Sequence, residues 1–252
     1  MLSKNKIKDL TRLSQKKYRD EAGVFVAEGN KLVEELLAVF RCQLLAATPE
    51  WLRQNTEKIK KNTEIVEVSP DELKRISQHP APQQVFAVFE KPDYRLDDEN
   101  FTQKLTLALD DIQDPGNLGT ILRIADWFGI DSVICSLHCA DVFNSKTIQA
   151  SMGAIARVKV FVVDLPEFLS RQKNDLAIIG TFLDGDNIYT ETLPANGIIV
   201  MGNEGKGISP EVEQHINRRL FIPSFPPERP TSESLNVAVA TAVVCAEFRR
   251  PK

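Results

Sequence analysis

The loop at residues 201–209, "MGNEGKGIS", has the composition of a ligand-binding loop. Its three glycines let the main chain approach a bound group closely. The spacing G-x-x-G-x-G is neither a dinucleotide fingerprint nor a Walker A motif, and the carboxylate of Glu204 would repel a phosphate. We therefore expect this loop to hold a neutral or cationic ligand. A plain glycine-rich turn before a helix capped by Ser209 is the alternative.

A second polar cluster occupies residues 110–123, "DDIQDPGNLGTILR". A predicted strand ends at Asp110, a Pro-Gly turn follows, and Asn117 is placed to cap a helix that carries Arg123. Residues six apart do not share a helical face. Asn117 and Arg123 therefore converge only if Asn117 lies in the cap and the arginine folds back. A capped helix with a surface arginine is the alternative.

The third cluster lies in residues 222–240, "IPSFPPERPTSESLNVAVA". A proline-rich loop leads into an apolar helix opened by Ser232 or Ser234, and Asn236 adds a polar group at its start. Capping alone would explain these residues. However, ligands of open parallel sheets bind beyond the carboxyl ends of the strands, and all three clusters follow predicted strands. This position favours a functional role for all three clusters.

Taken together, the three stretches resemble motifs 1, 2 and 3 of the SpoU (TrmH) family of RNA 2'-O-methyltransferases. "QASMGAIARV" is similar to the family segment between the first two motifs. The resemblance covers about residues 105–250, and its specificity comes from the joint order and spacing. The matching stretches are N-x-G-x-x-x-R (117–123), GNEGKG (202–207), IP (222–223) with SLNVAVA (234–240), and QASMGAIARV (149–158).

The resemblance implies an α/β fold of the SPOUT type whose C-terminal parallel-sheet domain contains a trefoil knot. True knots are rare among folds, and composition and periodicity do not indicate one here. The resemblance also implies an obligate homodimer and S-adenosylmethionine as the cofactor. By analogy with the family, the cofactor contacts would be largely main-chain contacts at Gly202, Ile222 and Leu235.

The same resemblance makes Arg123 the central catalytic residue, acting on the ribose 2'-hydroxyl. A guanidinium stays protonated in proteins, so we expect Arg123 to position the hydroxyl and a backbone phosphate rather than to accept a proton. Alignment of the 2'-oxygen, methyl carbon and sulfur would supply much of the rate. The hydroxyl also makes RNA rather than DNA the partner. The residues expected to orient Arg123 or the RNA are Asn117, Glu204, Ser234 and Asn236.

One stretch departs from the family pattern. Between Ile222-Pro223 and Ser234 the family usually has a shorter, glycine-containing loop, whereas this chain has "SFPPERPTSE" (224–233), ten residues with three prolines. The cofactor contacts in this loop and the role of Arg229 therefore do not follow from the resemblance.

The elements that must position these residues form two α/β units. Residues 1–92 are expected to form an N-terminal unit, residues 93–104 a linker and residues 105–252 the methyltransferase domain. The first unit resembles the RNA-binding domain that many such enzymes carry, including "FVAEGNKLVEELL" (25–37). Helices fit at 1–20, 30–40, 49–60, 70–78, 117–129, 144–151, 166–172, 209–216 and 232–248. Strands fit at 23–29, 42–48, 63–69, 83–90, 105–110, 132–136, 158–163, 176–182, 197–202 and 219–224.

Charge distribution agrees with an RNA partner, although the net charge is −4. Residues 1–20 hold seven basic residues against two aspartates, and a second basic group includes Arg218, Arg219, Arg229, Arg249 and Arg250. Solubility and a frayed tail are the alternative explanation. The appended N-terminal unit favours ribosomal RNA over tRNA. A non-catalytic RNA-binding or assembly factor, and more remotely a nucleotide hydrolase, are the competing functions.

Composition argues against a membrane protein, a secreted protein and a metal site. No apolar run is long enough for a membrane span, and "MLSKNKIKDL" lacks the apolar core of a signal peptide, so we expect a cytosolic protein without a membrane partner. The four cysteines form no paired framework. Cys135, His138 and Cys139 offer at most three zinc ligands at unusual spacing, so we expect two semi-buried thiols rather than a metal site.

Overall fold

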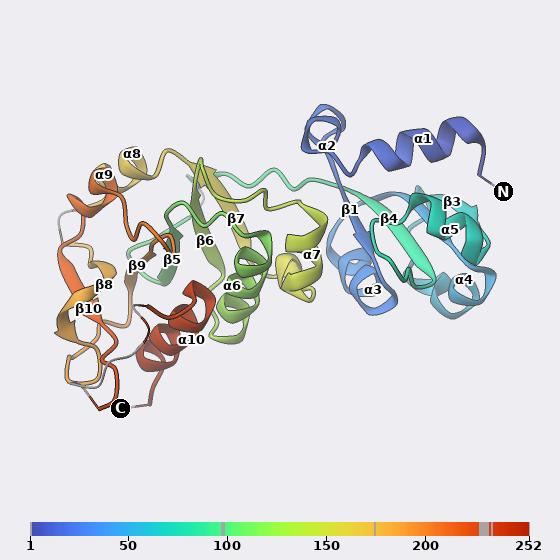
Figure 1. Ribbon diagram of the computed structural model, residues 1–252. Helices are drawn as coiled ribbons and strands as arrows, with labels where there is room; N and C mark the ends of the chain where they lie inside the picture. Colours follow the sequence, from blue (N-terminus) through green and yellow to red (C-terminus); the bar gives the residue numbers. More distant parts are fainter. Residues whose placement is uncertain (1, 97–98, 174, 227–231, 233, 252) are drawn as a thin grey trace. The chain divides into compact units, whose positions relative to one another are not determined.

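The computed structural model describes residues 2–96, 99–173, 175–226, 232 and 234–251, and the chain divides into two compact units (Figure 1). Unit 1 comprises Met1–Asp93 and Asp141–Ala156, and unit 2 comprises Tyr94–Ala140 and Arg157–Lys252. The division after residue 93 lies close to the expected end of the first domain. Two details differ from the expectation: residues 141–156 cluster with unit 1, and residues 94–104 of the expected linker cluster with unit 2.

Unit 1 is built on a mixed four-stranded sheet in the order β1-β4-β2-β3. Strand β4 is antiparallel to both neighbours, and β2 and β3 are parallel. The strands are β1 (Val24–Glu28), β2 (Cys42–Ala47), β3 (Glu64–Glu67) and β4 (Val85–Glu90). The helices are α1 (Lys4–Arg12), α2 (Lys16–Ala22), α3 (Asn30–Val39), α4 (Pro49–Asn55), the 3₁₀ helix η1 (Thr56–Lys58), α5 (Pro70–Ile76), α7 (Ser145–Ser151) and the 3₁₀ helix η3 (Ala154–Ala156).

The single helix predicted over residues 1–20 is wrong, because the chain forms α1 and α2 with a break between them. The guanidinium of Arg19 explains the break. Its Nη1 donates to the carbonyl oxygens of Leu13 and Ser14 at 2.7 and 2.8 Å. Those carbonyls are therefore satisfied without a continuing helix.

Several basic residues of this N-terminal stretch serve the fold. Arg19 is 2% exposed and forms an ion pair with Asp141, which ties α2 to the second segment of unit 1. Lys6 pairs with Glu64 at 2.8 Å, and Lys16 pairs with Asp20. The charge count therefore overstates the free positive surface of residues 1–20, since a buried and paired arginine is not available to a phosphate.

Four phenylalanines form the centre of unit 1. The ring centroid of Phe25 on β1 lies 5.2 Å from that of Phe40, 5.4 Å from that of Phe89 and 5.1 Å from that of Phe143. Phe143 belongs to the segment 141–156, so this cluster explains why that segment packs with unit 1.

Unit 2 contains a six-stranded sheet in which every neighbouring pair is parallel, in the order β10-β8-β9-β5-β6-β7. This is the expected parallel-sheet domain. The strands are β5 (Leu105–Leu109), β6 (Ser132–Ser136), β7 (Lys159–Val163), β8 (Ile178–Asn187), β9 (Gly197–Met201) and β10 (Arg218–Phe221). The helices are α6 (Pro115–Trp127), α8 (Leu165–Ser170), α9 (Pro210–Glu213) and α10 (Val237–Phe248).

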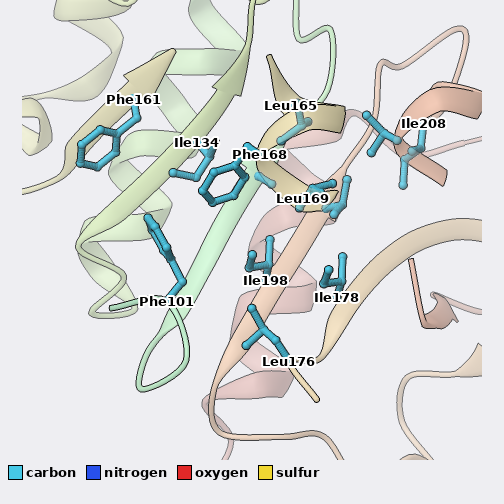
Figure 2. Close-up of a cluster of buried hydrophobic side chains, with 13 residues drawn as sticks. Phe101, Ile134, Phe161, Leu165, Phe168, Leu169, Leu176, Ile178, Ile198 and Ile208 are labelled. Atoms are coloured by element: carbon cyan, nitrogen blue, oxygen red, sulfur yellow. The ribbon is translucent and has the colours of Figure 1, made fainter. Parts of the chain in front are cut away.

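Both faces of the central strands are covered, since all five residues of β5, β6 and β9 are buried. Figure 2 shows one of the two apolar layers. Leu165, Phe168 and Leu169 of α8 pack there against Ile134 and Ile198 of the sheet. Each large apolar side chain buried in this way contributes about 1.5–3 kcal/mol.

Two side chains of the expected linker, Glu99 and Phe101, pack within unit 2. Phe101 is 7% exposed, and its ring meets that of Phe168 edge-on at 5.2 Å. The Glu99 side chain is 4% exposed and forms ion pairs with Lys104 and Lys159. Burial raises the pKa of the Glu99 carboxyl, but hydrogen bonds from the two lysines outweigh burial and leave the pKa lowered.

Helices α6 and α10 lie side by side and run in the same direction (Figure 1). At their starts, Asn236 Nδ2 donates to Asn117 Oδ1 at 3.1 Å. At their ends, Arg249 Nε donates to the Phe128 carbonyl at 3.0 Å. The first turns of both helices are therefore brought to the same place.

Candidate active site

The three polar clusters follow β5, β9 and β10, as the sequence predicts. Strands β5 and β9 are parallel neighbours that end in register, with Leu109 opposite Met201. Their following loops therefore emerge side by side at the carboxyl edge of the sheet. This is the position at which open parallel sheets bind ligands.

The glycine-rich loop after β9 is a small, closed hairpin. Asn203 and Gly207 exchange both main-chain hydrogen bonds, at 3.0 and 2.9 Å. The Asn203 side chain fills the turn, since its Oδ1 accepts from the N–H groups of Gly205 and Lys206 at 2.9 and 3.1 Å. Its Nδ2 donates to the Asp111 carbonyl at 2.8 Å, which fixes the loop to the end of β5.

Gly202 is required by close packing of main chain against main chain. A Cβ at this position would lie 2.4 Å from the Gly207 carbonyl carbon and 2.5 Å from the Ile208 nitrogen, closer than any side chain permits. Gly207 has φ +71°, a left-handed conformation that favours glycine. The glycines thus serve the turn itself as well as an open main-chain surface.

Two aspartates after β5 hold the same loop. Asp110 is 5% exposed, and its Oδ2 accepts from both the N–H and the hydroxyl of Ser209 at 2.7 Å. Lys206 pairs with Asp111 at 3.3 Å. Ser209 precedes α9, as expected, but its hydroxyl makes no capping hydrogen bond, and it donates to Asp110.

The cap of α6 differs from the prediction. Asp114 caps this helix, with its Oδ1 accepting from the Asn117 N–H at 2.8 Å, and Pro115 occupies the first helical position. Asn117 therefore lies inside the first turn, and its side chain is released from capping. Its Nδ2 donates to Glu204 Oε1, and its Oδ1 accepts from Asn236.

The cap of α10 also differs. The helix begins at Val237 rather than residue 232, and Asn236 caps it in place of the expected Ser232 or Ser234. The Asn236 Oδ1 accepts from the N–H groups of Ala238 and Val239 at 3.0 and 3.3 Å, while its Nδ2 reaches Asn117. The side-chain amide of Asn236 thus connects the first turns of α6 and α10.

The structure therefore joins three of the five predicted catalytic residues, Glu204, Asn117 and Asn236, into one hydrogen-bonded chain. Arg123 and Ser234 do not join it. Arg123 is exposed on α6 and makes no hydrogen bond or ion pair within the described part of the chain. Six residues turn a helix by about 600°, which carries Arg123 away from Asn117. Ser234 is exposed as well.

A pocket of about 930 Å³ lies against this chain of residues. Its walls include all three predicted cofactor residues, Gly202, Ile222 and Leu235, together with Glu204 and Ser234. Buried apolar side chains, among them Met201 and Ile208, form its inner part. The volume is within the range of about 300–1,000 Å³ for cofactor pockets. Arg229 lies outside the described residues, as does most of the proline-rich loop.

This pocket fits S-adenosylmethionine. A Cβ on Gly202 would meet the main chain of the turn at its wall, so the loop presents main chain rather than a side chain there. Glu204 supplies a carboxylate on the pocket wall, which suits a cationic sulfonium better than a phosphate. The residues at the site therefore agree with the expectation of a neutral or cationic ligand.

The cysteines near the site are internal thiols. Cys135 is buried on β6, and Cys139 Sγ accepts from the Ile112 N–H at 3.4 Å. A hydrogen bond from the Cys135 thiol lowers the pKa of Cys139 to about 7 against the opposing effect of burial, with help from Ser136 and the Ile112 N–H. Within the described ranges, no group of three or more His, Cys, Asp or Glu side chains is placed to hold a metal.

Sequence reasoning missed Asp110, Asp114 and Asn203 as residues that build the site. Each holds main chain in place, and Asn203 also lines the pocket. Two signals were present: Asp before Pro-Gly favours a helix cap, and Asn within a glycine-rich loop favours a turn that its own side chain closes.

The parallel sheet, the loops at its carboxyl edge and the cofactor-sized pocket define the class of α/β proteins that bind a ligand at the edge of a parallel sheet. Comparison with known proteins identifies the family. The model of the SpoU rRNA methylase family matches residues 104–246, and that of the MRM3-like substrate binding domain matches residues 4–87. The chain belongs to the SpoU rRNA methylase family, and it is an RNA ribose 2'-O-methyltransferase that uses S-adenosylmethionine.

Individual relatives agree with this assignment over nearly the whole chain. The chain is 31% identical over 250 residues to the 23S rRNA (guanosine(2553)-2'-O)-methyltransferase RlmP of Bacillus subtilis, covering 97% of this chain and 96% of that protein. A putative RNA methyltransferase of the TrmH family from Porphyromonas gingivalis is 44% identical, with a TM-score of 0.89 and 99% of each chain covered. An AdoMet-bound rRNA methyltransferase from Sinorhizobium meliloti is 28% identical, with a TM-score of 0.88 and 99% and 96% covered.

Proposed function

We propose that the substrate is ribosomal RNA, methylated at one ribose 2'-hydroxyl. The observation that carries this proposal is the hydrogen-bonded chain Glu204–Asn117–Asn236, whose Glu204 lies on the wall of the pocket that Gly202, Ile222 and Leu235 also line. Relatives named as 23S rRNA and rRNA methyltransferases support ribosomal RNA over tRNA. Unit 1, most of which matches a substrate-binding domain, would bind the RNA.

The cofactor would be held by the main chain at Gly202, Ile222 and Leu235. S-adenosylmethionine supplies an electrophilic methyl group on a cationic sulfur when it is bound. The hairpin at residues 203–207 is locked by Asn203, so the main chain that faces the pocket is held in one conformation before binding. Glu204 places negative charge on the same side.

Arg123 acts on the RNA in this proposal. Its guanidinium remains protonated, so it stabilises the negative charge that develops on the 2'-oxygen and holds a neighbouring phosphate. Asn117 and Asn236 keep Glu204 in place through their hydrogen bonds. Ser234 adds a hydroxyl at the pocket wall that can orient the RNA. The common result is alignment of the ribose oxygen with the methyl group.

The active protein would be a homodimer. Helix α10 is apolar, and Val239 on its outer side is 52% exposed. Trp127 on the adjacent α6 is 84% exposed. Exposed apolar surface of this kind is covered in obligate dimers. Arg123 lies on the same helix as Trp127, one turn earlier, so the second subunit would complete the surroundings of this arginine.

A trefoil knot in the C-terminal domain is part of the proposal, and the family match over residues 104–246 supports it. The structure contains no helix, in the ranges it describes, that is long and apolar enough to cross a bilayer. We place the protein in the cytoplasm, where ribosomal RNA is assembled into subunits.

Labelled S-adenosylmethionine and ribosomal RNA from a strain lacking the gene test the function. The purified protein should transfer label to one ribose, and nuclease digestion should release that nucleoside as its 2'-O-methyl derivative. Label on tRNA alone would overturn the rRNA assignment. Tight RNA binding without transfer of label would favour a non-catalytic assembly factor.

A further inference from the structure

The mouth of the cofactor pocket carries exposed apolar side chains that the cofactor site does not explain. Leu183 on β8 is 78% exposed, and Phe225, after β10, is 93% exposed. Both line the pocket. The inner walls are different in character, since Met201 and Val237 are 2% and 4% exposed. The pocket therefore runs from a buried inner part to an exposed rim, where Leu183 and Phe225 lie among charged side chains such as Asp184 and Lys206.

Phe225 has a free aromatic surface. Phe182, another aromatic of the pocket, has the Arg219 guanidinium carbon 3.6 Å from its ring centroid. Phe225 makes no ring–ring or cation–ring contact within the ranges that the structure describes. A phenylalanine ring that stays in water contributes almost no burial free energy to the fold. Its position on the rim of a catalytic pocket points to a ligand that covers the ring.

We infer that Phe225 is a substrate-binding residue on which the base of the target nucleotide, or of its immediate neighbour, stacks. The reaction brings a ribose to the pocket, so the attached bases come to its rim. Unstacked RNA bases are bound by stacking on aromatic side chains. The apolar side chain of Leu183 lies on the rim of the same pocket and would pack against the other face of the base or its edge.

The cofactor is a less suitable occupant for this ring. The inner part of the pocket, which buried side chains such as Met201 and Val237 line, is the part that can enclose a small cofactor. Phe225 lies beyond Ile222 and Pro223, which are half-buried, at a point where the chain has reached the surface. The exposed ring therefore suits a macromolecule that approaches from outside.

This inference rests on the proposed function, and the test separates the two. Methyl transfer to ribosomal RNA is measured for wild type, Phe225→Ala and Phe225→Trp, together with the Kd for S-adenosylmethionine from calorimetry. Tyr189→Ala is the matched control, because Tyr189 is 46% exposed and is not part of the pocket wall. If wild type itself transfers no label to RNA, the proposed function fails before the inference is tested.

Phe225→Ala should raise the KM for RNA about tenfold, equivalent to about 1.4 kcal/mol, with the cofactor Kd unchanged. Phe225→Trp should retain the wild-type KM, and its added tryptophan fluorescence should be quenched when RNA binds. Tyr189→Ala should match wild type. An unchanged KM for Phe225→Ala would overturn the inference. So would a weakened cofactor Kd with unaltered RNA binding, which would make Phe225 a cofactor contact.

Discussion

Two glutamates of unit 2 show how the same side chain serves the fold in one place and the site in another. Glu99 has a side chain that is 4% exposed, and two lysines neutralise it. Glu204 is exposed on the pocket wall, and its partner among the described residues is the neutral amide of Asn117. The first carboxylate is saturated, whereas the second keeps its charge and part of its hydrogen-bonding capacity.

The difference indicates where the structure reserves interactions for a ligand. A buried carboxylate must be paired, because an unpaired charge in the interior is costly. An exposed carboxylate held in place by a neutral amide can meet a cationic ligand without first breaking an ion pair. We therefore expect substitutions of Glu204 to affect activity and substitutions of Glu99 to affect stability.

The largest expected effect is at Arg123, which is also exposed and unpaired in the described structure. Arg123→Ala should lower the rate of methyl transfer about 10²–10³-fold, since a charge that stabilises the developing oxyanion is lost. The cofactor Kd should stay the same. Single-turnover transfer from labelled S-adenosylmethionine measures the rate. Arg123→Lys should recover only part of it, because lysine lacks the planar fork. Wild-type rates for Arg123→Ala would show that the arginine has no catalytic role.

Gly202→Ala should weaken cofactor binding at least about tenfold, because the added Cβ lies 2.4 Å from main chain and forces the hairpin to shift. Calorimetry with S-adenosylmethionine measures the change. Gly205→Ala is the control, since its Cβ would meet nothing closer than the Asn203 Oδ1 at 3.6 Å. Equal losses of cofactor affinity in Gly202→Ala and Gly205→Ala would argue against the explanation by close packing at Gly202.

Glu204→Gln tests whether the charge of the exposed Glu204 carboxylate contributes to activity. It should reduce kcat/KM about tenfold through loss of charge, while the melting temperature stays within the error of wild type. Asn117→Ala should have a similar effect, and the double variant should lose less than the product of the two, because the residues belong to one network. A large fall in melting temperature for Glu204→Gln would show that Glu204, like Glu99, stabilises the fold.

Glu99→Gln is expected to have the smallest effect, about 1 kcal/mol of unfolding free energy at pH 7 with activity unchanged. The pKa of Glu99 is lowered in the folded protein. Its stabilisation is therefore complete above the unfolded pKa and is lost as the pH falls through the folded pKa. Urea unfolding of wild type and variant should consequently converge toward low pH. A difference that grows on acidification would contradict this sign.

Much of the architecture could be predicted because the parallel strands of unit 2 are short apolar runs. The range 132–136 agrees with β6, and the other predicted strands of unit 2 overlap β5 and β7–β10. The predicted starts of the helices were less accurate than the predicted strands. Asp114 and Asn236 cap α6 and α10 where Asn117 and Ser232 or Ser234 were expected. Several residues near each start can cap a helix, and tertiary hydrogen bonds select among them.

Contacts between segments far apart in the chain could not be predicted from the sequence. The pairing of Arg19 with Asp141 spans 122 residues and joins α2 to the segment 141–156 of unit 1. A count of basic residues treats Arg19 as surface charge. Only the folded chain shows that it is 2% exposed and paired.

The sequence by itself determined the family, the motif residues and the expectation of a sulfonium rather than a phosphate ligand, because these depend on residue types at fixed spacing. The tertiary structure decided which of those residues meet. Glu204, Asn117 and Asn236 come together because parallel strands end at one edge and two helices start there, whereas helical rotation turns Arg123 away. It also showed Phe225 exposed at the pocket rim, which residue type alone does not indicate.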